Sequence, residues 1–590
     1  MRRLLTILGL LAFWSGNLAA QSAWDGYRDD DRLTHSLREA LAGKESLARL
    51  GRLTESGNGR TIWTVEIART GGTPVDQRPG LLLLSNLSGD RPVADEVLAS
   101  MIEKLLAEDL GEERMKKLLD EHVLYCVLRP NPDATRSFFT APRQERRRNA
   151  TPTDDDRDGR TDEDGPDDLD GDGVITWMRV PDPAGDWLID SEDGRKMRKP
   201  DAEKGERGTH RLVIEGKDDD GDEQVNEDAA GGVDLSRNFA HAWQEHDRAT
   251  GDYPNCERET HALIEWVLAR PNIAAVLVLD RHDNLVNPPK ASSRGGGGEA
   301  PGGGGRGRRG AREPETQVQS QDVSLYTEAS EQFKKLLGVE KADPEPADGA
   351  FFEWAYFQFG VPAFASRVWY GPGPEKTEEA ADEEEGSEES APSAPRRGGR
   401  ARSGSRGGDD ADRETEWLAW NERALNGAGF VAWKAFDHPD LGEVEIGGWK
   451  PFVKTNPPAS EIPALADAHL GLLHFMAEQF GHIAIQEVEV EDHGSGLYTV
   501  KAVLTNDGRL PTAIRQGQMN REVLPVRVDL ELHGQELILG EKMSSINSLD
   551  GRGGREELTW MIRGEPGSRV TLSVRSQKAG RARQEVRLDG

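Results

Sequence analysis

Three aspartates at alternating positions, Asp168, Asp170 and Asp172, form a spacing that suits metal binding. Gly173 follows the third of them directly. Carboxylate oxygens at loop positions 1, 3 and 5, with a turn glycine at position 6, suit a hard cation such as calcium. Position 12 is Arg179 rather than a bidentate glutamate. The spacing therefore predicts a partial calcium loop and not a complete EF-hand.

Two acidic stretches extend this theme. Residues 154–172 hold eleven acidic side chains and two arginines, and residues 218–228 hold seven acidic side chains and no basic one. Crowded carboxylates repel one another, so an ordered structure here requires cations. We expect structural Ca²⁺ in an insert at 151–230, with a solvated acidic loop as the alternative. The other candidate ligands are Asp154, Asp156, Asp158, Asp218, Asp220 and Asp222.

Buried strands and amphipathic helices alternate along residues 21–484. Continuous apolar runs are typical of strands that are covered on both faces of a parallel sheet, and apolar residues at helical spacing indicate the covering helices. The expected fold class is α/β, with a mixed, mainly parallel sheet flanked by helices. We expect strands at 81–84, 123–128 and 276–279, and helices at 93–106 and 263–268.

The remaining segments differ in composition from this domain. Residues 291–320 and 372–412 are low-complexity and are expected to form flexible inserts, because they bury too little apolar surface to offset chain entropy. Residues 485–590 alternate apolar and polar side chains with a period of two, which predicts a β-sandwich. The His533–Glu536 segment imitates a His-x-x-Glu metal motif, but it reads as the end of a sandwich strand followed by a hairpin turn at Gly534.

Several motifs occur in a characteristic order. They are Ser-Gly-Asp-Arg-Pro at 88–92, Asn-Pro-Asp at 131–133, Val-Asp-Leu-Ser-Arg-Asn-Phe at 233–239, Tyr-Pro-Asn-Cys-Glu-Arg-Glu-Thr at 253–260, Gly-Val-Pro-Ala-Phe at 360–364 and His-Pro-Asp-Leu-Gly at 438–442. This set resembles the zinc carboxypeptidases, the carboxypeptidase A-like metallopeptidases, and in particular secreted bacterial members with a C-terminal β-sandwich. The resemblance implies a zinc-dependent hydrolysis of C-terminal residues from peptides.

The residues at the family's catalytic positions differ from the family pattern. The family holds Zn²⁺ with two histidines and a glutamate, and a separate glutamate acts as general base. The matching metal positions here are Ser88, Arg91 and Asp280, and Arg367 replaces the general base. Two guanidinium groups repel a dication and do not deprotonate. We expect no zinc at this position and consider an ion-pair cluster of the two arginines with Asp280.

Part of the family's substrate-binding pattern is retained. By the resemblance, Arg237 matches the arginine that binds the terminal carboxylate of the peptide, and a guanidinium suits that role. Its neighbour is Ser236, where the family has asparagine, and Arg148 lies near the position of the family's oxyanion-stabilising arginine. A structural ion pair is the alternative for each arginine.

Three functional hypotheses follow. The first is a carboxypeptidase-like protein without peptidase activity that binds peptide termini or other carboxylates. The second is an active metallocarboxypeptidase with a site rearranged around Asp280 and His282. The third is a cell-surface interaction scaffold in which the acidic loops and the sandwich matter most. The charges at positions 91 and 367 separate the first two hypotheses.

The net charge and the N-terminal sequence limit the possible partners and the compartment of the protein. A net charge of −32 argues against nucleic acid as a partner. Residues 1–20 combine a basic start, a short apolar run and small residues before Gln21, which predicts a signal peptide and an exported, periplasmic or extracellular protein. No run of 18 apolar residues predicts a membrane span. Whether Cys126 and Cys256 pair is left open.

Overall fold

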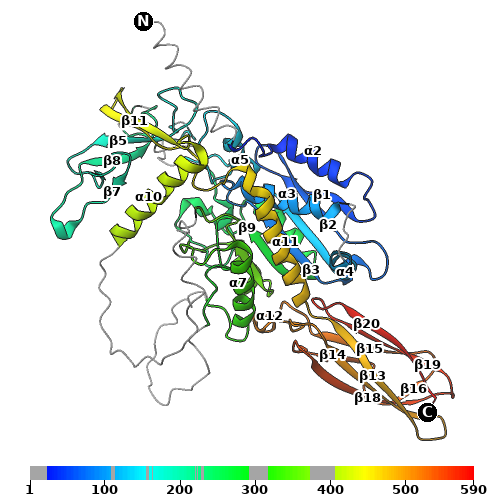
Figure 1. Cartoon of the computed structure of the whole chain (residues 1–590). Helices are drawn as coiled ribbons and strands as arrows, with labels where there is room; N and C mark the ends of the chain where they lie inside the picture. The colour runs from blue at the N-terminus through cyan, green and yellow to red at the C-terminus, as the bar shows by residue number, and fades with distance from the viewer. Residues whose placement is uncertain are drawn as a thin grey trace, which may run out of the picture.

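A six-stranded sheet in the order β1-β2-β4-β3-β9-β10 forms the centre of the larger domain (Figure 1). The computed structural model describes residues 23–107, 113–154, 159–162, 164–219, 221, 224–226, 231–291, 317–372 and 406–589. The strands are β1 (Ala48–Glu55), β2 (Thr61–Ile67), β3 (Gly80–Ser85), β4 (Val123–Leu128), β9 (Ile273–Leu279) and β10 (Ala363–Ser366). Strands β4, β3, β9 and β10 pair in parallel, whereas β1–β2 and β2–β4 pair antiparallel. The predicted mixed, mainly parallel sheet is confirmed.

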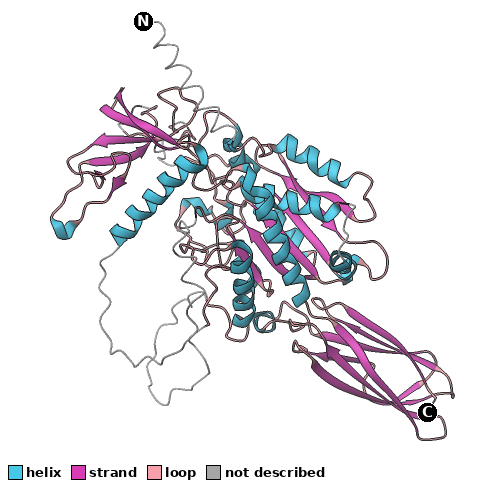
Figure 2. Cartoon of the chain, in the orientation of Figure 1, coloured by secondary structure: helices cyan, strands magenta, loops and turns pink. Residues whose placement is uncertain are grey.

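Helices cover this sheet and explain why its strands are continuously apolar. Every residue of β3, β4 and β9 is buried. Helix α11 (Ile462–Gln479) lies against both α3 (Pro92–Leu106) and α7 (Val323–Leu337), and α2 (Asp30–Leu41) packs beside α3 (Figure 2). Helix α6 (Arg258–Leu268) packs against β1. The other helices are α4 (Glu113–Glu121), α5 (Pro132–Phe139), α8 (Phe351–Phe357), α10 (Arg406–Leu425) and α12 (Arg515–Asn520).

A second, smaller sheet lies beside the main domain, in the order β11-β12-β5-β8 (Figure 1). It joins strands from the acidic insert to strands near residue 440, with a small core of Met178, Val180, Val444 and Ile446. The expectation that the insert consists of loops is therefore incomplete, because half of this sheet comes from it. The strands are β5 (Trp177–Pro181), β8 (His210–Ile214), β11 (Phe430–His438) and β12 (Gly442–Trp449); β6 (Leu188–Ile189) pairs with β7 (Met197–Arg198).

The C-terminal region consists of two four-stranded sheets that enclose a separate core. One sheet contains β13 (Ile483–Asp492), β14 (Leu497–Asn506), β18 (Gly554–Arg563) and β16 (Glu536–Leu539). The other contains β17 (Met543–Ile546), β15 (Val526–Leu532), β19 (Arg569–Arg575) and β20 (Arg581–Arg587). The predicted sandwich is confirmed. The predicted hairpin at Gly534 is wrong, because β15 and β16 belong to different sheets and the turn carries the chain between them.

The sandwich is joined to the main domain by a buried lysine. Lys578, in the turn between β19 and β20, donates from Nζ to the carbonyl oxygens of Pro271 (2.9 Å) and Ile273 (2.7 Å). Its ammonium also lies 4.3 Å from the ring centroid of Phe359. These contacts place the turn at the start of β9.

Neither cysteine forms a disulfide, and the helices give no membrane span. Cys126 is buried in β4, and Cys256 accepts a hydrogen bond from Asn238 Nδ2 at 3.2 Å. Within the described ranges, none of the helices combines the length and the apolar character that crossing a bilayer requires. The predicted signal peptide at 1–20 lies outside the described residues.

Candidate functional site at the carboxyl ends of the parallel strands

The four residues at the family's catalytic positions follow three adjacent parallel strands. Ser88 and Arg91 lie in the loop between β3 and α3, Asp280 follows β9, and Arg367 follows β10. Strands β3, β9 and β10 are neighbours in the sheet. Ligand sites in open α/β sheets form at such carboxyl ends, so the order of strands alone brings these four side chains to one place.

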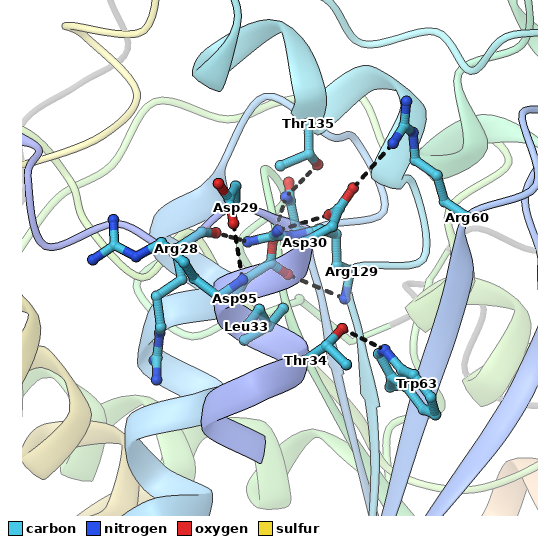
Figure 3. A network of polar contacts seen from close by, with 12 residues as sticks. Arg28, Asp29, Asp30, Leu33, Thr34, Arg60, Trp63, Asp95, Arg129 and Thr135 are labelled. Atoms are coloured by element: carbon cyan, nitrogen blue, oxygen red, sulfur yellow. Dashed lines mark hydrogen bonds and ion pairs between the residues drawn. The ribbon is translucent and has the colours of Figure 1, made fainter. Parts of the chain in front are cut away.

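A buried polar network supports the loop that carries Ser88 and Arg91 (Figure 3). Asp95, on the first turn of α3, accepts hydrogen bonds from Ser85 Oγ at 2.7 Å and Arg129 Nε at 2.9 Å. Arg129 continues to Asp30 at 2.9 Å, and Asp95 also accepts from Asn86 Nδ2 at 2.8 Å. Each member of this network is satisfied by a partner of opposite charge or by an amide, which makes the loop's foundation rigid.

Close packing against α5 determines the shape of the same loop. Gly89 has a φ of 79°, and a Cβ at this position would lie 2.4 Å from the Cβ of Ala134. Asn131 donates from Nδ2 to the carbonyl oxygen of Leu87 at 3.2 Å, and Asn86 Oδ1 accepts from the backbone N–H of Arg91 at 3.0 Å. The glycine is required for both reasons, its positive φ and the absent space.

Ser88 and Asp280 are bonded directly to each other. The Ser88 hydroxyl oxygen lies 2.5 Å from Asp280 Oδ1 and 2.6 Å from Asp90 Oδ1. A hydroxyl group has one hydrogen, so only one of these two contacts can use the serine proton. The other needs a proton on a carboxyl group. The three side chains therefore form a chain that holds one proton beyond the serine's own.

The environments of the two carboxyl groups assign that proton to Asp280. Burial and the charge of Asp90 raise the pKa of Asp280 to about 7. Burial also acts on Asp90, but Arg147 and Arg91 outweigh it and lower the pKa of Asp90 to about 2. Below about pH 7, the neutral Asp280 thus donates to Ser88, and Ser88 donates to the charged Asp90.

The two arginines do not form the expected ion pair with Asp280. Within the described part of the chain, the Arg91 guanidinium has neither a hydrogen bond nor an ion pair, and its Nε is buried without a partner. Arg367 donates from Nη2 to the carbonyl oxygen of Asp343, and its Nε is also unpartnered. The ion-pair cluster considered from the sequence is not formed among the described residues: Asp280 Oδ1 contacts Ser88, and Asp280 Oδ2 has no partner.

Two other arginines in the cluster are paired. Arg147 Nε lies 2.7 Å from Asp90 Oδ2. Arg281 lies 3.0 Å from Asp234 and 2.8 Å from Glu345. Sequence reasoning did not include these pairs, although Arg281 directly follows Asp280.

The predicted substrate-binding residues lie beside this cluster. Ser236 Oγ donates to Asp234 Oδ1 at 2.6 Å, which connects it to the Arg281 pair. Arg237 forms an ion pair with Asp247 at 2.7 Å. Arg148 bridges to Asp234 through the backbone, and it is its neighbour Arg147 that contacts Asp90. Their role in binding substrate stays a prediction.

His282 is not turned toward a shared ligand set. Its Nε2 lies 3.1 Å from the carbonyl oxygen of Pro346, and its ring packs against Phe352. Burial and the charge of Arg281 lower the pKa of His282 to about 3. The imidazole is therefore neutral and engaged in a structural hydrogen bond.

A second candidate site lies in the acidic insert. Ligand atoms of Asp168, Asp170 and Glu215 all lie within 4.8 Å of one another. The loop is shaped by its own aspartates: Asp168 accepts from the backbone N–H groups of Asp172 (3.0 Å) and Gly173 (2.8 Å). Among the residues that the structure describes, this is the one acidic, histidine or cysteine group with such a spacing.

Sequence reasoning missed Glu215. It follows β8 and is fully buried, accepting from the backbone N–H groups of Leu169 (2.7 Å) and Thr176 (2.9 Å). A carboxylate thus stands where the EF-hand pattern lacks its glutamate at position 12, but it comes from another strand. The available signal was a single glutamate at the end of an alternating run, just before the 218–228 acidic stretch.

The other predicted calcium ligands are only partly covered. Asp154 Oδ2 accepts from Gly159 N at 3.1 Å, and Asp218 Oδ1 accepts from Gly221 N at 2.5 Å. The structure does not join these two aspartates to the Asp168 group. Asp156, Asp158, Asp220 and Asp222 lie outside the described residues.

Comparison with known proteins covers both parts of the chain. A model of the zinc carboxypeptidase family matches residues 33–373, and a model described as a domain of unknown function matches residues 482–587. Human carboxypeptidase D is 29% identical over 136 residues, which make up 20% of this chain and 10% of that protein. The chain thus spans about a tenth of the length of this curated relative.

Similar solved structures include two carboxypeptidase-fold proteins. Thrombin activatable fibrinolysis inhibitor is 10% identical, and the match covers 78% of this chain and 76% of the inhibitor chain, with a TM-score of 0.39. Carboxypeptidase A from Helicoverpa armigera is 13% identical and covers 57% and 64%, with a TM-score of 0.34. The family model, by contrast, matches more than half of the chain. The chain belongs to the zinc carboxypeptidase family.

Proposed function

We propose that this chain uses the carboxypeptidase fold for binding and does not hydrolyse peptides with zinc at the family's position. The observation that carries this proposal is the 2.5 Å contact between Ser88 Oγ and Asp280 Oδ1. Two oxygen ligands of one tetrahedral Zn²⁺ lie roughly 3.3 Å apart, since each bond is about 2.0 Å long. The two side chains therefore share a proton at a distance too short for a common metal ion.

The charges around this contact point the same way. Arg91 and Arg367 bring two permanent positive charges to the place where relatives have carboxylates. The charged Arg367 side chain does not accept a proton from water, so the general base is lost together with the metal. The residues present do not fit zinc, and no hydrolytic step is assigned to them.

Carboxylate-bearing ligands, including peptide termini, are the proposed binding partners. Arginine side chains surround the cluster, and a guanidinium matches a carboxylate with two parallel hydrogen bonds. Arg237 retains a partly exposed side chain beside its partner Asp247. We propose no nucleic acid partner, because the net charge of −32 opposes one.

Zinc content and peptidase activity test this function together. The full chain is incubated with excess Zn²⁺, dialysed, and its metal content is measured by mass spectrometry. Release of C-terminal residues is measured on peptides with apolar, basic and acidic ends, with an active family member as the positive control. We expect substoichiometric zinc and no release above background. Stoichiometric zinc together with turnover would instead favour the rearranged site around Asp280 and His282, which now lacks a third ligand within the described residues.

An interaction scaffold is a second candidate, supported by exposed apolar side chains on the sandwich. Ile538, Leu539 and Met543, on or beside β16 and β17, are 41%, 62% and 55% exposed. Exposed apolar residues gathered at sheet edges are typical of contact surfaces. Pull-down of peptides with the full chain and with a Leu539→Lys, Met543→Lys variant separates the candidates, because carboxylate binding at the cluster should survive these changes.

We further propose that Asp168, Asp170, Asp172 and Glu215 bind a structural Ca²⁺. Calcium accepts six to eight oxygen ligands at about 2.3–2.6 Å, which suits the carboxylates of Asp168, Asp170 and Glu215 gathered within 4.8 Å. Asp172 belongs to the same loop by its spacing. The expected result is a rise in the melting temperature with millimolar Ca²⁺ that EDTA reverses. Calorimetric titration without calcium binding at millimolar concentration contradicts this proposal.

Export is proposed from the signal-like residues 1–20. N-terminal sequencing of the protein recovered from its native cell tests it, and we expect the mature chain to begin at Gln21. Recovery of a chain that retains Met1 contradicts the proposal.

A further inference from the structure

Two of the four arginines in the cluster have no carboxylate within ion-pair distance among the described residues. Asp90 is paired with Arg147, and Asp234 and Glu345 are paired with Arg281. Arg91 is 7% exposed and Arg367 is 9% exposed. Neither has an ion pair within the described residues, and Glu345 acts on both only through space.

Two further carboxyl groups lie near Arg91, and neither forms an ion pair with it. Glu145 acts on Arg91 only through space and accepts a hydrogen bond from Thr455 Oγ1 at 3.4 Å. Asp280 Oδ1 is engaged by Ser88, through the hydroxyl at 2.5 Å and the backbone N–H at 3.2 Å. Asp280 Oδ2 is an acceptor without a partner, and the residue is 1% exposed. Buried polar groups in proteins are nearly always satisfied, so two unpartnered Nε donors and one unpartnered acceptor in one cluster require an explanation.

Bound water explains the hydrogen bonds but not the charge. Two desolvated guanidinium groups that repel each other are stabilised by an anion much more than by a neutral molecule. Arg91 follows β3 and Arg367 follows β10, the strands on either side of β9, so both cations lie at the same edge of the sheet and repel each other. A planar carboxylate offers two oxygens, one for each guanidinium.

We propose that Arg91 and Arg367 bind the carboxylate of a small organic acid at the position where zinc carboxypeptidases hold their metal. Asp280 Oδ2 accepts a hydrogen bond from an O–H or N–H on the carbon next to that carboxylate. The ligand class is therefore a 2-hydroxy acid or an N-acyl amino acid. This inference rests on the proposed function, because a metal-binding site would exclude the anion.

The unpaired arginines also predict that replacing one of them does not lower the stability of the ligand-free protein. An unpaired buried cation destabilises the ligand-free protein, and replacing it by a neutral side chain of similar shape relieves this cost. Arg91→Gln should therefore leave the melting temperature of the ligand-free protein unchanged or raise it. A residue that held the fold together would lower it.

The test is calorimetric titration of the full chain, free of metal and in low-chloride buffer, with four probes. Glycolate and N-acetylglycine carry a carboxylate and the adjacent donor, acetate lacks the donor, and acetamide lacks the charge. We expect the first two to bind at least about tenfold more tightly than acetate, since one buried hydrogen bond is worth about 1.4 kcal/mol or more. Acetamide should not bind. A preference between glycolate and N-acetylglycine identifies the source of the donor.

Matched variants locate the binding site. Arg91→Gln and Arg367→Gln should each weaken glycolate binding at least tenfold. Arg552→Gln removes the same charge from an exposed pair with Glu328 and should leave binding unchanged. Binding of acetamide as tight as that of glycolate, unchanged binding in both cluster variants, or no binding of any carboxylate overturns the proposal. The absence of zinc and of peptidase activity is measured separately, so the proposed function stands or falls independently.

Discussion

Two charged regions of this protein carry opposite charges at positions where a metal ion has to be considered. At the ends of β3, β9 and β10, where the family places a dication, the chain itself supplies cations, Arg91 and Arg367. In the acidic insert, the chain gathers three carboxylates within 4.8 Å of one another. The charges of the first region oppose a metal ion, and those of the second favour one.

The difference shows how the same physical requirement is met in two ways. Buried charge must be neutralised or left protonated. At the first region Asp280 keeps a proton, and its partner Asp90 is neutralised by Arg147. In the second, backbone N–H groups hold the Asp168 and Glu215 carboxylates in place without neutralising them. A loop that is ordered by hydrogen bonds but remains anionic is suited to bind a cation.

Restoring the family's metal ligands in the first region should remove the contrast between the two regions, and we expect this change to have the largest effect. We expect the variant Ser88→His, Arg91→Glu, Asp280→His to gain zinc affinity by at least about 1,000-fold, because three ligands of the usual types replace a hydroxyl, a cation and a protonated carboxyl. Zinc is measured by competition with a chromophoric chelator.

The matched control keeps the arginine. The variant Ser88→His, Asp280→His should remain a poor zinc binder if the Arg91 charge is the main obstacle. Equal zinc affinity of the two variants would show that charge at this position is unimportant and would remove the basis of the comparison.

Glu215 gives a test of the second region. Glu215→Gln keeps the size of the side chain but removes one charge from the proposed calcium ligands, so we expect calcium affinity to fall about 10- to 100-fold. Melting temperatures with calcium and with EDTA measure the calcium-dependent increment, which separates this effect from lost hydrogen bonds to Leu169 and Thr176. As a control, Glu445→Gln changes a half-exposed glutamate that faces Arg179 in the adjacent sheet. An increment unchanged by Glu215→Gln counts against the site.

Asp280 should give the first region a distinctive pH dependence. Its pKa of about 7 in the folded state lies above that of an unfolded aspartate, about 4. Between these values the unfolded chain loses the proton and the folded chain keeps it, so this group's contribution to stability is lost as pH rises and levels off above 7. The groups that face it are Ser88, Asp90 and Arg281.

Asn is the neutral mimic of this protonated carboxyl. Between pH 5 and pH 8, the stability of the unaltered protein relative to Asp280→Asn should fall by about 2–3 kcal/mol. Urea unfolding at several pH values measures the difference. A parallel pH profile of both proteins, or strong destabilisation by Asp280→Asn at pH 5, means that Asp280 is charged and the proton chain is wrong.

The sequence predicted the framework of the first region well, for identifiable reasons. The apolar runs at 81–84 and 276–279 are buried on both faces, and such runs can hardly be anything but central strands. Asp280 directly follows β9 and Arg367 directly follows β10, so both lie at the carboxyl edge of the sheet. The pairing inside the cluster was not predictable, since Arg147, Asp234 and Glu345 come from loops whose paths no periodicity encodes.

In the acidic insert, the sequence predicted the loop but not all of its carboxylates. The spacing of Asp168, Asp170 and Asp172 identified the loop. Glu215 lies more than 40 positions away and reaches the loop only because β8 pairs with β5. Strand pairing between such short segments depends on tertiary context rather than on local pattern, so the fourth carboxylate could not be read from the spacing.

A third buried basic residue provides the finest test, because its polar group has hydrogen-bond partners and the Arg91 Nε has none. Lys578 is 7% exposed, as Arg91 is, but its Nζ donates to two carbonyl oxygens and lies over the ring of Phe359. Lys578→Met leaves those two carbonyls without a donor and should destabilise the protein by about 1–3 kcal/mol. Arg91→Met leaves no acceptor unsatisfied and should be neutral or stabilising. Urea unfolding of both variants measures the two signs. If both variants lose stability equally, Arg91 has partners as good as those of Lys578. The Arg91 cluster then holds no unpaired charge, and the contrast with the acidic insert is lost.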